Sequence, residues 1–218
     1  MNRLHTLSLP DYLAERLKKE LPAKEALKMM FPNIKAMPEH IPPTVRLSAV
    51  MVLLFVKNSE WHLLAIRRTE DGHAHSGQIG FPGGRYEEED KDLGVTALRE
   101  TFEEIGIPAE AIKVLGPMSP VYVVVSNFNV FPYVGYLETL PEFEISPNEV
   151  QAVLEIKLSD LFSAAAKTET EVVSPAFPDI RRRVNAYKVQ DNVIIWGATA
   201  IMMAELELLL READHEFF

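Results

Sequence analysis

Charge is concentrated in one short stretch near the middle of this 218-residue chain. Residues 87–104 contain eight acidic side chains and two basic ones, so they carry −6 of the formal net charge of −10. Like charges spaced three or four residues apart destabilise a helix by roughly 0.2 to 0.5 kcal/mol for each pair. A fold that contains this stretch needs a counter-charge close to it, and this requirement constrains the chain more than any other feature.

Apolar residues at helical spacing predict a helix over residues 92–105, which Gly106 and Pro108 would end. At about 100° per residue, one face of this helix carries Val95, Leu98, Phe102 and Ile105. The opposite face carries Glu100, Glu103 and Glu104. We therefore expect the apolar face to be buried against the core and the three glutamates to project together from the other side.

Three carboxylates on one helix face suit either a solvated surface or a site for a divalent cation. Mg²⁺ prefers oxygen ligands and is usually held by one or two carboxylates together with substrate phosphates. The preceding loop, residues 81–84, has the sequence Phe-Pro-Gly-Gly, and its two glycines allow the backbone to approach a ligand or to turn sharply. An acidic surface balanced by Arg99 and a plain Pro-Gly turn are the structural alternatives.

The rest of the chain predicts an α/β domain, residues 46–218, preceded by an extension, residues 1–45. Leucines at four-residue spacing predict one or two amphipathic helices over residues 8–30, and four prolines mark residues 32–44 as a linker or strap. The other predicted elements are strands at 46–56, 61–68, 121–125, 130–137 and 150–156, a short helix near 158–166, and a strand leading into a long apolar helix at 193–212. Strands interleaved with few helices favour a mixed sheet between helices.

The spacing of the glycines and charged residues resembles the Nudix box, G-x5-E-x7-R-E-U-x-E-E-x-G-U, in which U is an apolar residue. The matching positions are Gly84, Asp90, Arg99, Glu100, Glu103, Glu104, Gly106 and Ile107. The chain departs from the signature in having Asp90 for the first glutamate, eight residues rather than seven before Arg99, and Thr101 at the first apolar position. An aspartate with the longer gap is similar to the coenzyme A pyrophosphatase branch of the family.

A second resemblance to that branch lies upstream of the box. The branch pattern LLTxR-S/A-x3-R-x3-G-x3-FPGG is matched at Leu63, Leu64, Arg67, Gly77 and residues 81–84. The departures are Ala65, Arg68 and His73, with one extra residue before His73. The likeness covers about residues 46–210, whereas residues 1–45 contain no motif of the family.

The resemblance implies a Nudix α/β/α sandwich with a mixed β-sheet between helices. It also implies a hydrolase that cleaves a diphosphate bond with Mg²⁺ or Mn²⁺ as cofactor. Glu100 and Glu104 would be the principal metal ligands, with Glu103 as a further ligand or the general base. Arg99 would orient a box glutamate, which completes the catalytic set of Arg99, Glu100 and Glu103.

For the coenzyme A branch, the implied substrate is coenzyme A or a thioester of it, cleaved to 3′,5′-ADP and 4′-phosphopantetheine products. The 3′-phosphate of this substrate requires extra cations. The candidate substrate-binding residues are Arg67, Arg68, His73 and His75 before the glycine loop, and the backbone of Gly83 and Gly84. An exposed strand end is the structural alternative for the two arginines.

Three further features allow both a structural and a functional interpretation. Residues 181–183 are three consecutive arginines, which we expect to form a solvated turn, with an anion contact as the alternative. Glu149 is a candidate extra carboxylate from a loop. Trp196, Met202 and Met203 are expected to pack in the core.

Composition excludes several classes of protein. The chain has no cysteine, which excludes disulfides, a thiol nucleophile and cysteine-ligated metal sites. The net charge of −10 argues against broad nucleic-acid binding, which requires a basic face. No stretch reaches the roughly 18 apolar residues of a membrane span, and the N-terminus lacks a signal-peptide pattern, so we expect a cytoplasmic protein without a membrane partner.

Three alternatives to coenzyme A hydrolysis stay open. The same chemistry would serve another small nucleoside diphosphate-linked substrate, such as NADH or ADP-ribose. A Nudix domain that senses a nucleotide without catalysis is a second alternative, which the presence of all three box glutamates disfavours. In the third, the helices of residues 8–30 dock a partner protein; they would equally cover the sheet of their own subunit or of a second copy in a homodimer.

Overall fold

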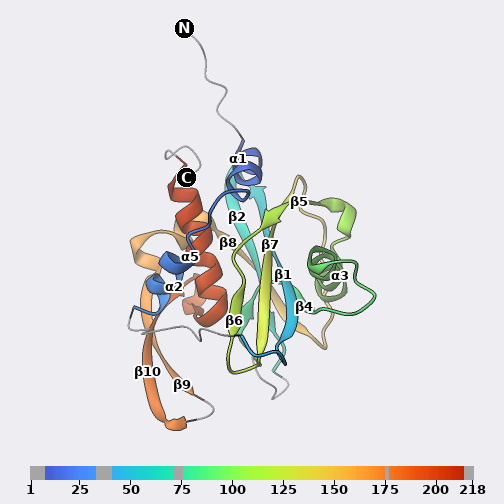
Figure 1. Cartoon of the computed structure of the whole chain (residues 1–218). Coiled ribbons are helices and arrows are strands. Elements are labelled where there is room, and N and C mark those ends of the chain that lie inside the picture. Colours follow the sequence, from blue (N-terminus) through green and yellow to red (C-terminus); the bar gives the residue numbers. More distant parts are fainter. Residues whose placement is uncertain (1–7, 33–40, 71–75, 175–176, 214–218) are drawn as a thin grey trace.

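The computed structural model describes residues 8–32, 41–70, 76–174 and 177–213 (Figure 1). The helices are α1 (Leu9–Arg16), α2 (Ala23–Met30), α3 (Leu93–Ile105), α4 (Leu158–Leu161) and α5 (Gly197–Arg211), with short 3-10 turns at Ala109–Ala111, Ala164–Ala166 and Gln190–Asn192. The strands are β1 (Arg46–Lys57), β2 (Glu60–Arg68), β3 (Ile79–Gly80), β4 (Gly83–Arg85), β5 (Ile112–Pro117), β6 (Val121–Val123), β7 (Phe128–Leu137), β8 (Val150–Lys157), β9 (Lys167–Ser174), β10 (Phe177–Lys188) and β11 (Ile194–Ile195).

The main sheet is mixed, as predicted. Its path runs β3-β2-β1-β7-β5, and β4, β6 and β8 pair with β1, β7 and β2. Strands β1 and β7 are parallel, with Val52 opposite Val134, whereas β1 and β2 form an antiparallel hairpin. The turn of this hairpin has positive φ at Asn58 and Ser59, the conformation that two-residue hairpin turns require.

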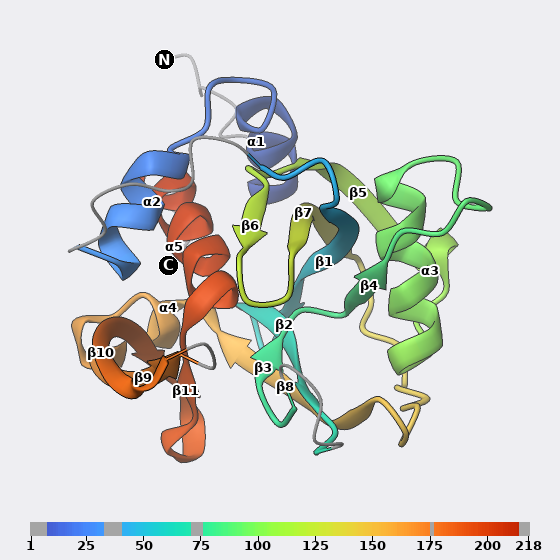
Figure 2. The ribbon, with the colours of Figure 1, turned by 60° about the horizontal axis from the view of Figure 1, so that its bottom comes forward.

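Helices cover both faces of this sheet, which confirms the predicted sandwich (Figure 2). Alternate residues of each strand point to opposite faces. In β2, Leu63 and Ala65 enter the cluster that contains the apolar side of α5, whereas Leu64 and Ile66 enter the cluster beneath α3. Odd-numbered residues in this part of β2 therefore face α5, and even-numbered residues face α3.

The two N-terminal helices pack on the α5 side of the sheet. Leu9 and Leu13 of α1 are buried in the same cluster as α5, and the Tyr12 hydroxyl donates a hydrogen bond to the Leu209 carbonyl at 2.8 Å. The predicted amphipathic helices are therefore present as α1 and α2, and they cover this chain's own core. Most of the predicted proline-rich strap, residues 33–40, lies outside the described residues.

The second sheet has the order β11-β10-β9, and most of it is a long hairpin of β9 and β10 that the sequence did not indicate. Arg181, Arg182 and Arg183 lie within β10, so the expected solvated turn is wrong. Arg181 and Arg183 form exposed ion pairs with Glu171 and Glu169 of β9. Because β9 is mostly polar and β10 contains three consecutive arginines, polar side chains lie on both faces of the hairpin and no apolar period reveals it in the sequence.

No helix in the described ranges is long and apolar enough to cross a membrane.

Candidate functional site

Helix α3 begins and ends at residues that cap it. The Asp92 carboxylate accepts a hydrogen bond from the Val95 N–H at 3.0 Å, which satisfies one of the free donors of the first turn. Gly106 follows the last turn with φ of 74°, and its N–H donates to the Phe102 carbonyl at 2.8 Å. A Cβ at Gly106 would lie 2.6 Å from that of Glu144, so only glycine fits here. The helix predicted over 92–105 is confirmed.

The buried face of α3 differs from the one predicted. The buried residues are Thr96, Ala97, Thr101, Glu104 and Ile105. The Phe102 side chain is 56% exposed, so its predicted place in the core is wrong. The Thr101 hydroxyl donates to the Ala97 carbonyl at 2.6 Å and thus needs no partner from the sheet. Short side chains on this face allow α3 to approach β1 and β4, and they bring Glu104 inside with them.

Arg99 is the counter-charge that the acidic stretch requires. Its guanidinium binds Asp90 through two nitrogens, Nε and Nη2, each 3.0 Å from a carboxylate oxygen. Its Nη1 donates to Glu100 at 3.0 Å and to Glu103 at 2.9 Å, and Nη2 also reaches the Arg85 carbonyl at 3.0 Å. One arginine therefore joins three acids of the stretch to β4, the strand that contains Gly83 and Gly84.

Asp90 belongs to the loop rather than to the cluster of glutamates. It is buried, and it accepts hydrogen bonds from the Thr96 hydroxyl at 2.8 Å and the Glu87 N–H at 3.1 Å. The hydrogen bond from Arg99 lowers the pKa of Asp90 to about 2. With its oxygens bound in this way, Asp90 fixes Arg99 and the loop.

Glu104 is the most unusual carboxylate of the site. It is 0% exposed, and its Oε2 accepts a hydrogen bond from the Gly83 N–H at 2.8 Å. Within the described part of the chain Oε1 accepts no hydrogen bond, and it forms an ion pair with Arg68 Nη1 at 3.4 Å. Burial raises the pKa of Glu104 to about 7, although the guanidinium of Arg68 opposes this shift. A buried carboxylate oxygen without a donor is costly and requires an explanation.

The glycine loop is shaped by its contacts with β1 and α3. Gly83 and Gly84 lie in β4, opposite Val50 and Ala49 of β1. A Cβ at Gly83 would be 2.3 Å from the Ala49 carbonyl, and one at Gly84 would be 2.4 Å from the carboxylate of Glu100. Only glycines allow the backbone of this strand to touch the carboxylates of α3.

Glu100 and Glu149 complete the group of charges around Glu104. Burial raises the pKa of Glu100, while Arg99 opposes the shift and the charges of Glu103 and Glu149 add to it. The charge of Glu149 raises the pKa of Glu104 as well. The loop before β8 is held there by the Ser146 N–H, which donates to the Glu104 carbonyl at 2.9 Å.

The donor set of this group fits a hard divalent cation. Every candidate ligand is an oxygen atom, Glu104 Oε1 is unsatisfied, and the Gly84 backbone lies against Glu100. Within the described ranges no three acidic or histidine side chains enclose an ion as they stand. Arg99 forms ion pairs with Glu100 and Glu103. For either glutamate to join Glu104 in binding a cation, its side chain would have to change rotamer.

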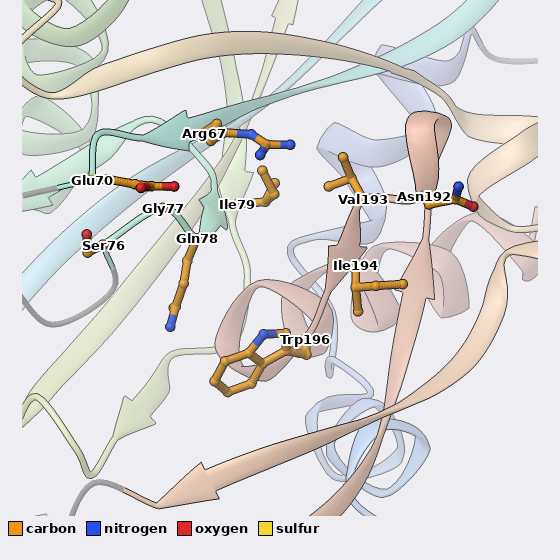
Figure 3. A pocket seen from close by; sticks show the side chains of 10 residues that line it. All are labelled: Arg67, Glu70, Ser76, Gly77, Gln78, Ile79, Asn192, Val193, Ile194 and Trp196. Carbon is orange, nitrogen blue, oxygen red and sulfur yellow. The ribbon is translucent and has the colours of Figure 1, made fainter. Parts of the chain in front are cut away.

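Arg67 and Arg68, predicted together as substrate-binding residues, diverge to opposite faces of β2. Arg68 faces α3 and Glu104, whereas Arg67 lines a cavity of about 430 Å³ on the α5 side (Figure 3). The other two candidates, His73 and His75, lie outside the described residues.

Residues near the C-terminus complete this cavity, which sequence reasoning missed. Asn192, Val193, Ile194 and Trp196 form the wall opposite Arg67 (Figure 3). Trp196 is 37% exposed, so its expected place in the core is wrong, whereas Met202 and Met203 are buried as predicted. One feature of the sequence could have indicated an exposed Trp196: it stands directly before Gly197, at the start of α5. Gly197 has positive φ.

Comparison with known proteins places these features in a family. Residues 45–177 match the NUDIX domain. The chain is 32% identical over 209 residues to the Nudix hydrolase NudL of Klebsiella pneumoniae (strain 342), covering 94% of this chain and 95% of that protein. It is 34% identical over 171 residues to NudL of Cronobacter sakazakii, covering 77% and 84%.

Solved structures show the same fold at low sequence identity. A MutT/nudix family protein from Enterococcus faecalis superimposes with a TM-score of 0.54 at 16% identity, over 96% of this chain and 77% of that one. A MutT protein from Methanosarcina mazei Go1 superimposes with a TM-score of 0.50 at 16% identity, over 78% and 96%. These two likenesses show the fold of the chain.

Proposed function

Because the chain belongs to the Nudix hydrolase family, whose members hydrolyse diphosphate bonds, we propose that it cleaves the diphosphate of coenzyme A or of a coenzyme A thioester. The products are 3′,5′-ADP and 4′-phosphopantetheine or its acylated form. The observation that carries the proposal is the buried, unsatisfied Oε1 of Glu104 between the glycine loop and Arg68. A carboxylate kept in this state is suited to bind a cation together with an anionic substrate.

The residues of α3 divide the work of the site. Glu100 and Glu104, one helical turn apart, hold Mg²⁺ or Mn²⁺, and Glu103 is a further ligand or the general base. When bound, the cation supplies Lewis acidity toward the phosphates and lowers the pKa of water at the site. Arg99 binds Glu100 and Glu103 and orients them, so it serves as a positioning residue within the catalytic set.

The loop and β2 bind the substrate in this proposal. The backbone of Gly83 and Gly84 borders the diphosphate, since this strand lies directly against the carboxylates of Glu100 and Glu104. Arg68 neutralises phosphate oxygens next to Glu104, and Arg67 and His75 contribute cations farther along the substrate. Glu149 adds a carboxylate from the loop before β8.

We propose coenzyme A rather than NADH or ADP-ribose as the substrate because of the residue spacing in the Nudix box. Asp90 with eight following residues before Arg99 is similar to the coenzyme A branch, and the Arg67 pattern upstream agrees. The departures at Ala65, Arg68 and His73 are the reason to keep NADH and ADP-ribose as the second candidates. A sensing module without catalysis is disfavoured, since Glu100, Glu103 and Glu104 are all present.

The test is hydrolysis of coenzyme A, acetyl-coenzyme A, NADH and ADP-ribose with Mg²⁺ or Mn²⁺ in excess, with products separated by chromatography. Formation of 3′,5′-ADP from the coenzyme A species alone is the expected result. Turnover of NADH or ADP-ribose alone would keep the diphosphate chemistry and reject the branch. No turnover of any substrate would favour the sensing module.

The setting of this activity is part of the proposal. We expect a cytoplasmic enzyme with a small-molecule substrate, without a nucleic-acid or membrane partner, since the net charge is −10. Helices α1 and α2 cover the chain's own α5, and a homodimer through their outer faces is the arrangement to test by light scattering. The division into an extension, residues 1–45, and a Nudix hydrolase domain, residues 46–218, is likewise proposed.

A further inference from the structure

The loop of residues 144–149, which leads into β8, is bound to the C-terminal end of α3. The Glu144 N–H donates to the Ile105 carbonyl at 3.1 Å, and the Ser146 N–H donates to the Glu104 carbonyl at 2.9 Å. The last turn of a helix leaves carbonyls without donors of its own. The loop supplies donors for two of them, so Glu104 contributes its backbone to this contact and its side chain to the candidate site.

A β-bulge turns the start of β8 toward α3. The register of β8 against β2 shifts between Arg67 and Arg68, which leaves Gln151 as an extra residue in β8. An extra residue reverses the faces of the side chains on one side of it. Val150 accordingly lies in the cluster beneath α3 together with Val153, although an unbroken strand would send these two valines to opposite faces. The bulge therefore directs the start of β8, and the loop before it, to the α3 side of the sheet.

Thr69, directly after the end of β2, binds the other end of this loop. Its N–H donates to the Glu149 carbonyl at 2.9 Å, and its hydroxyl donates to the Pro147 carbonyl at 3.2 Å. Its carbonyl accepts a hydrogen bond from the Gly77 N–H at 3.4 Å. One residue therefore joins residues 147–149 to the strand that carries Arg68.

Glu149 is an exposed residue whose negative charge acts on the candidate site. Burial raises the pKa of Glu100 and Glu104, and the charge of Glu149 adds to both shifts. Like charges repel, so a free loop would carry this carboxylate away from the other two. The contacts with α3 and Thr69 oppose that movement, and a divalent cation among the carboxylates would offset the repulsion.

We propose that Thr69 is a positioning residue of the site: its hydroxyl, by binding the Pro147 carbonyl, keeps Glu149 where it can share a divalent cation with Glu104. The inference rests on the proposed function for the cation at Glu104. Thr69 acts through the loop rather than on the cation itself. Because its hydroxyl makes a single neutral hydrogen bond, removing the hydroxyl loosens the loop and leaves the fold in place.

Binding of Mn²⁺ tests this role without any hydrolysis. Thr69→Val removes the hydroxyl and keeps the shape of the side chain. We expect its Kd for Mn²⁺, measured by calorimetry, to rise by about 2- to 10-fold, the range for the loss of one neutral hydrogen bond. Thr69→Ser keeps a hydroxyl and should restore the wild-type Kd. Thr168→Val is the matched control with an unchanged Kd, since the Thr168 hydroxyl donates to the Glu169 carbonyl on β9.

A double-mutant cycle with Glu149→Gln separates positioning from a general loss of structure. If Thr69 acts through Glu149, Thr69→Val has no further effect on the Kd for Mn²⁺ once Glu149→Gln is present. The same fold-change with and without Glu149→Gln would overturn the proposal. So would an unchanged Kd in a folded Thr69→Val protein, with folding checked by a thermal melt.

These outcomes differ from a failure of the proposed function. Unchanged Mn²⁺ affinity in the Thr69→Val variant of a protein that hydrolyses coenzyme A would reject the role of Thr69 alone. A wild-type protein that binds Mn²⁺ and hydrolyses none of the tested substrates would reject the hydrolase, and the cycle would still decide the role of Thr69. A wild-type protein that binds no Mn²⁺ would overturn both.

Discussion

Helices α3 and α5 both bury glutamates, but the hydrogen bonds of these glutamates differ between the two helices. On α5, Glu205 has a donor for each oxygen, since the Ser119 hydroxyl and the Ser119 N–H bind them at 2.5 and 3.0 Å. Glu207 accepts hydrogen bonds from the Tyr187 hydroxyl at 2.7 Å and from Arg211 at 2.8 Å, and it also pairs with Lys167. Each buried carboxylate on α5 is therefore fully satisfied.

Glu104 of α3 differs from both glutamates of α5. Glu104 is as deeply buried as Glu207, yet one of its oxygens has no donor within the described residues. A fold that satisfies Glu205 and Glu207 has the means to satisfy a third glutamate. The proposed function assigns this oxygen to a bound cation, and the predictions below test this difference between the two helices.

The largest effect is expected from Glu104→Gln. The variant removes a ligand charge, so we expect hydrolysis to fall by at least about 100-fold, the upper range for weakening a metal site. The protein should stay folded, because the substitution also relieves repulsion from Glu100. Initial rates with Mg²⁺ and a thermal melt measure the two effects. Full activity would contradict the role of Glu104 in the site, and a collapsed protein would show a structural role like that of Glu207.

The pH dependence of stability gives the next largest effect. The pKa of Glu104 is about 7 in the folded chain and about 4.5 when unfolded, so between these values the native state binds the additional proton. Stability from this group is complete below pH 4.5 and decreases as pH rises to 7, by on the order of 3 kcal/mol. Urea unfolding with a chelator present, in wild-type protein and Glu104→Gln, isolates this contribution. Parallel pH curves for the two proteins would argue against the raised pKa.

A smaller loss, and of stability rather than activity, is expected from Glu207→Gln. The substitution leaves the positive charges of Lys167 and Arg211 without their counter-ion, and we expect it to cost about 1 to 3 kcal/mol. Chemical denaturation measures the loss, and turnover at low temperature should stay within about threefold of wild type. Glu212→Gln, which breaks the exposed pair with Arg16, is the matched control, with a cost of about 0 to 1 kcal/mol. A large drop in turnover for a folded Glu207→Gln protein would contradict the assignment of a purely structural role to the buried glutamates of α5.

Local patterns in the sequence predicted much of the α3 side. The helix over 92–105 and its end at Gly106 follow from capping rules, and the hairpin of β1 and β2 follows from two apolar runs around a polar turn. The box identified Glu100, Glu103, Glu104 and Arg99 because their spacing is fixed within one helix. These features depend on residues close together in the chain.

The remaining features depend on contacts that no local pattern contains. The hairpin of β9 and β10 has polar side chains on both faces, so alternation gave no sign of it. Trp196 closes a cavity whose other wall is more than a hundred residues earlier. Arg67 and Arg68 looked equivalent as neighbours, yet β2 sends them to opposite faces of the sheet.

The smallest effect is expected from Phe102→Ala, which tests the face of α3 that the sequence misplaced. Counting apolar residues predicts Phe102 in the core, but the helix turns its shorter side chains and Glu104 toward the sheet. Because Phe102 is 56% exposed, we expect its truncation to change the free energy of unfolding by no more than about 0.5 kcal/mol. Ile105→Ala on the same helix, at a fully buried position, should cost about 2 to 5 kcal/mol. Equal costs for the two variants in chemical denaturation would mean that α3 buries its apolar face, and Glu104 would then be a surface residue without the strained environment on which the proposed site depends.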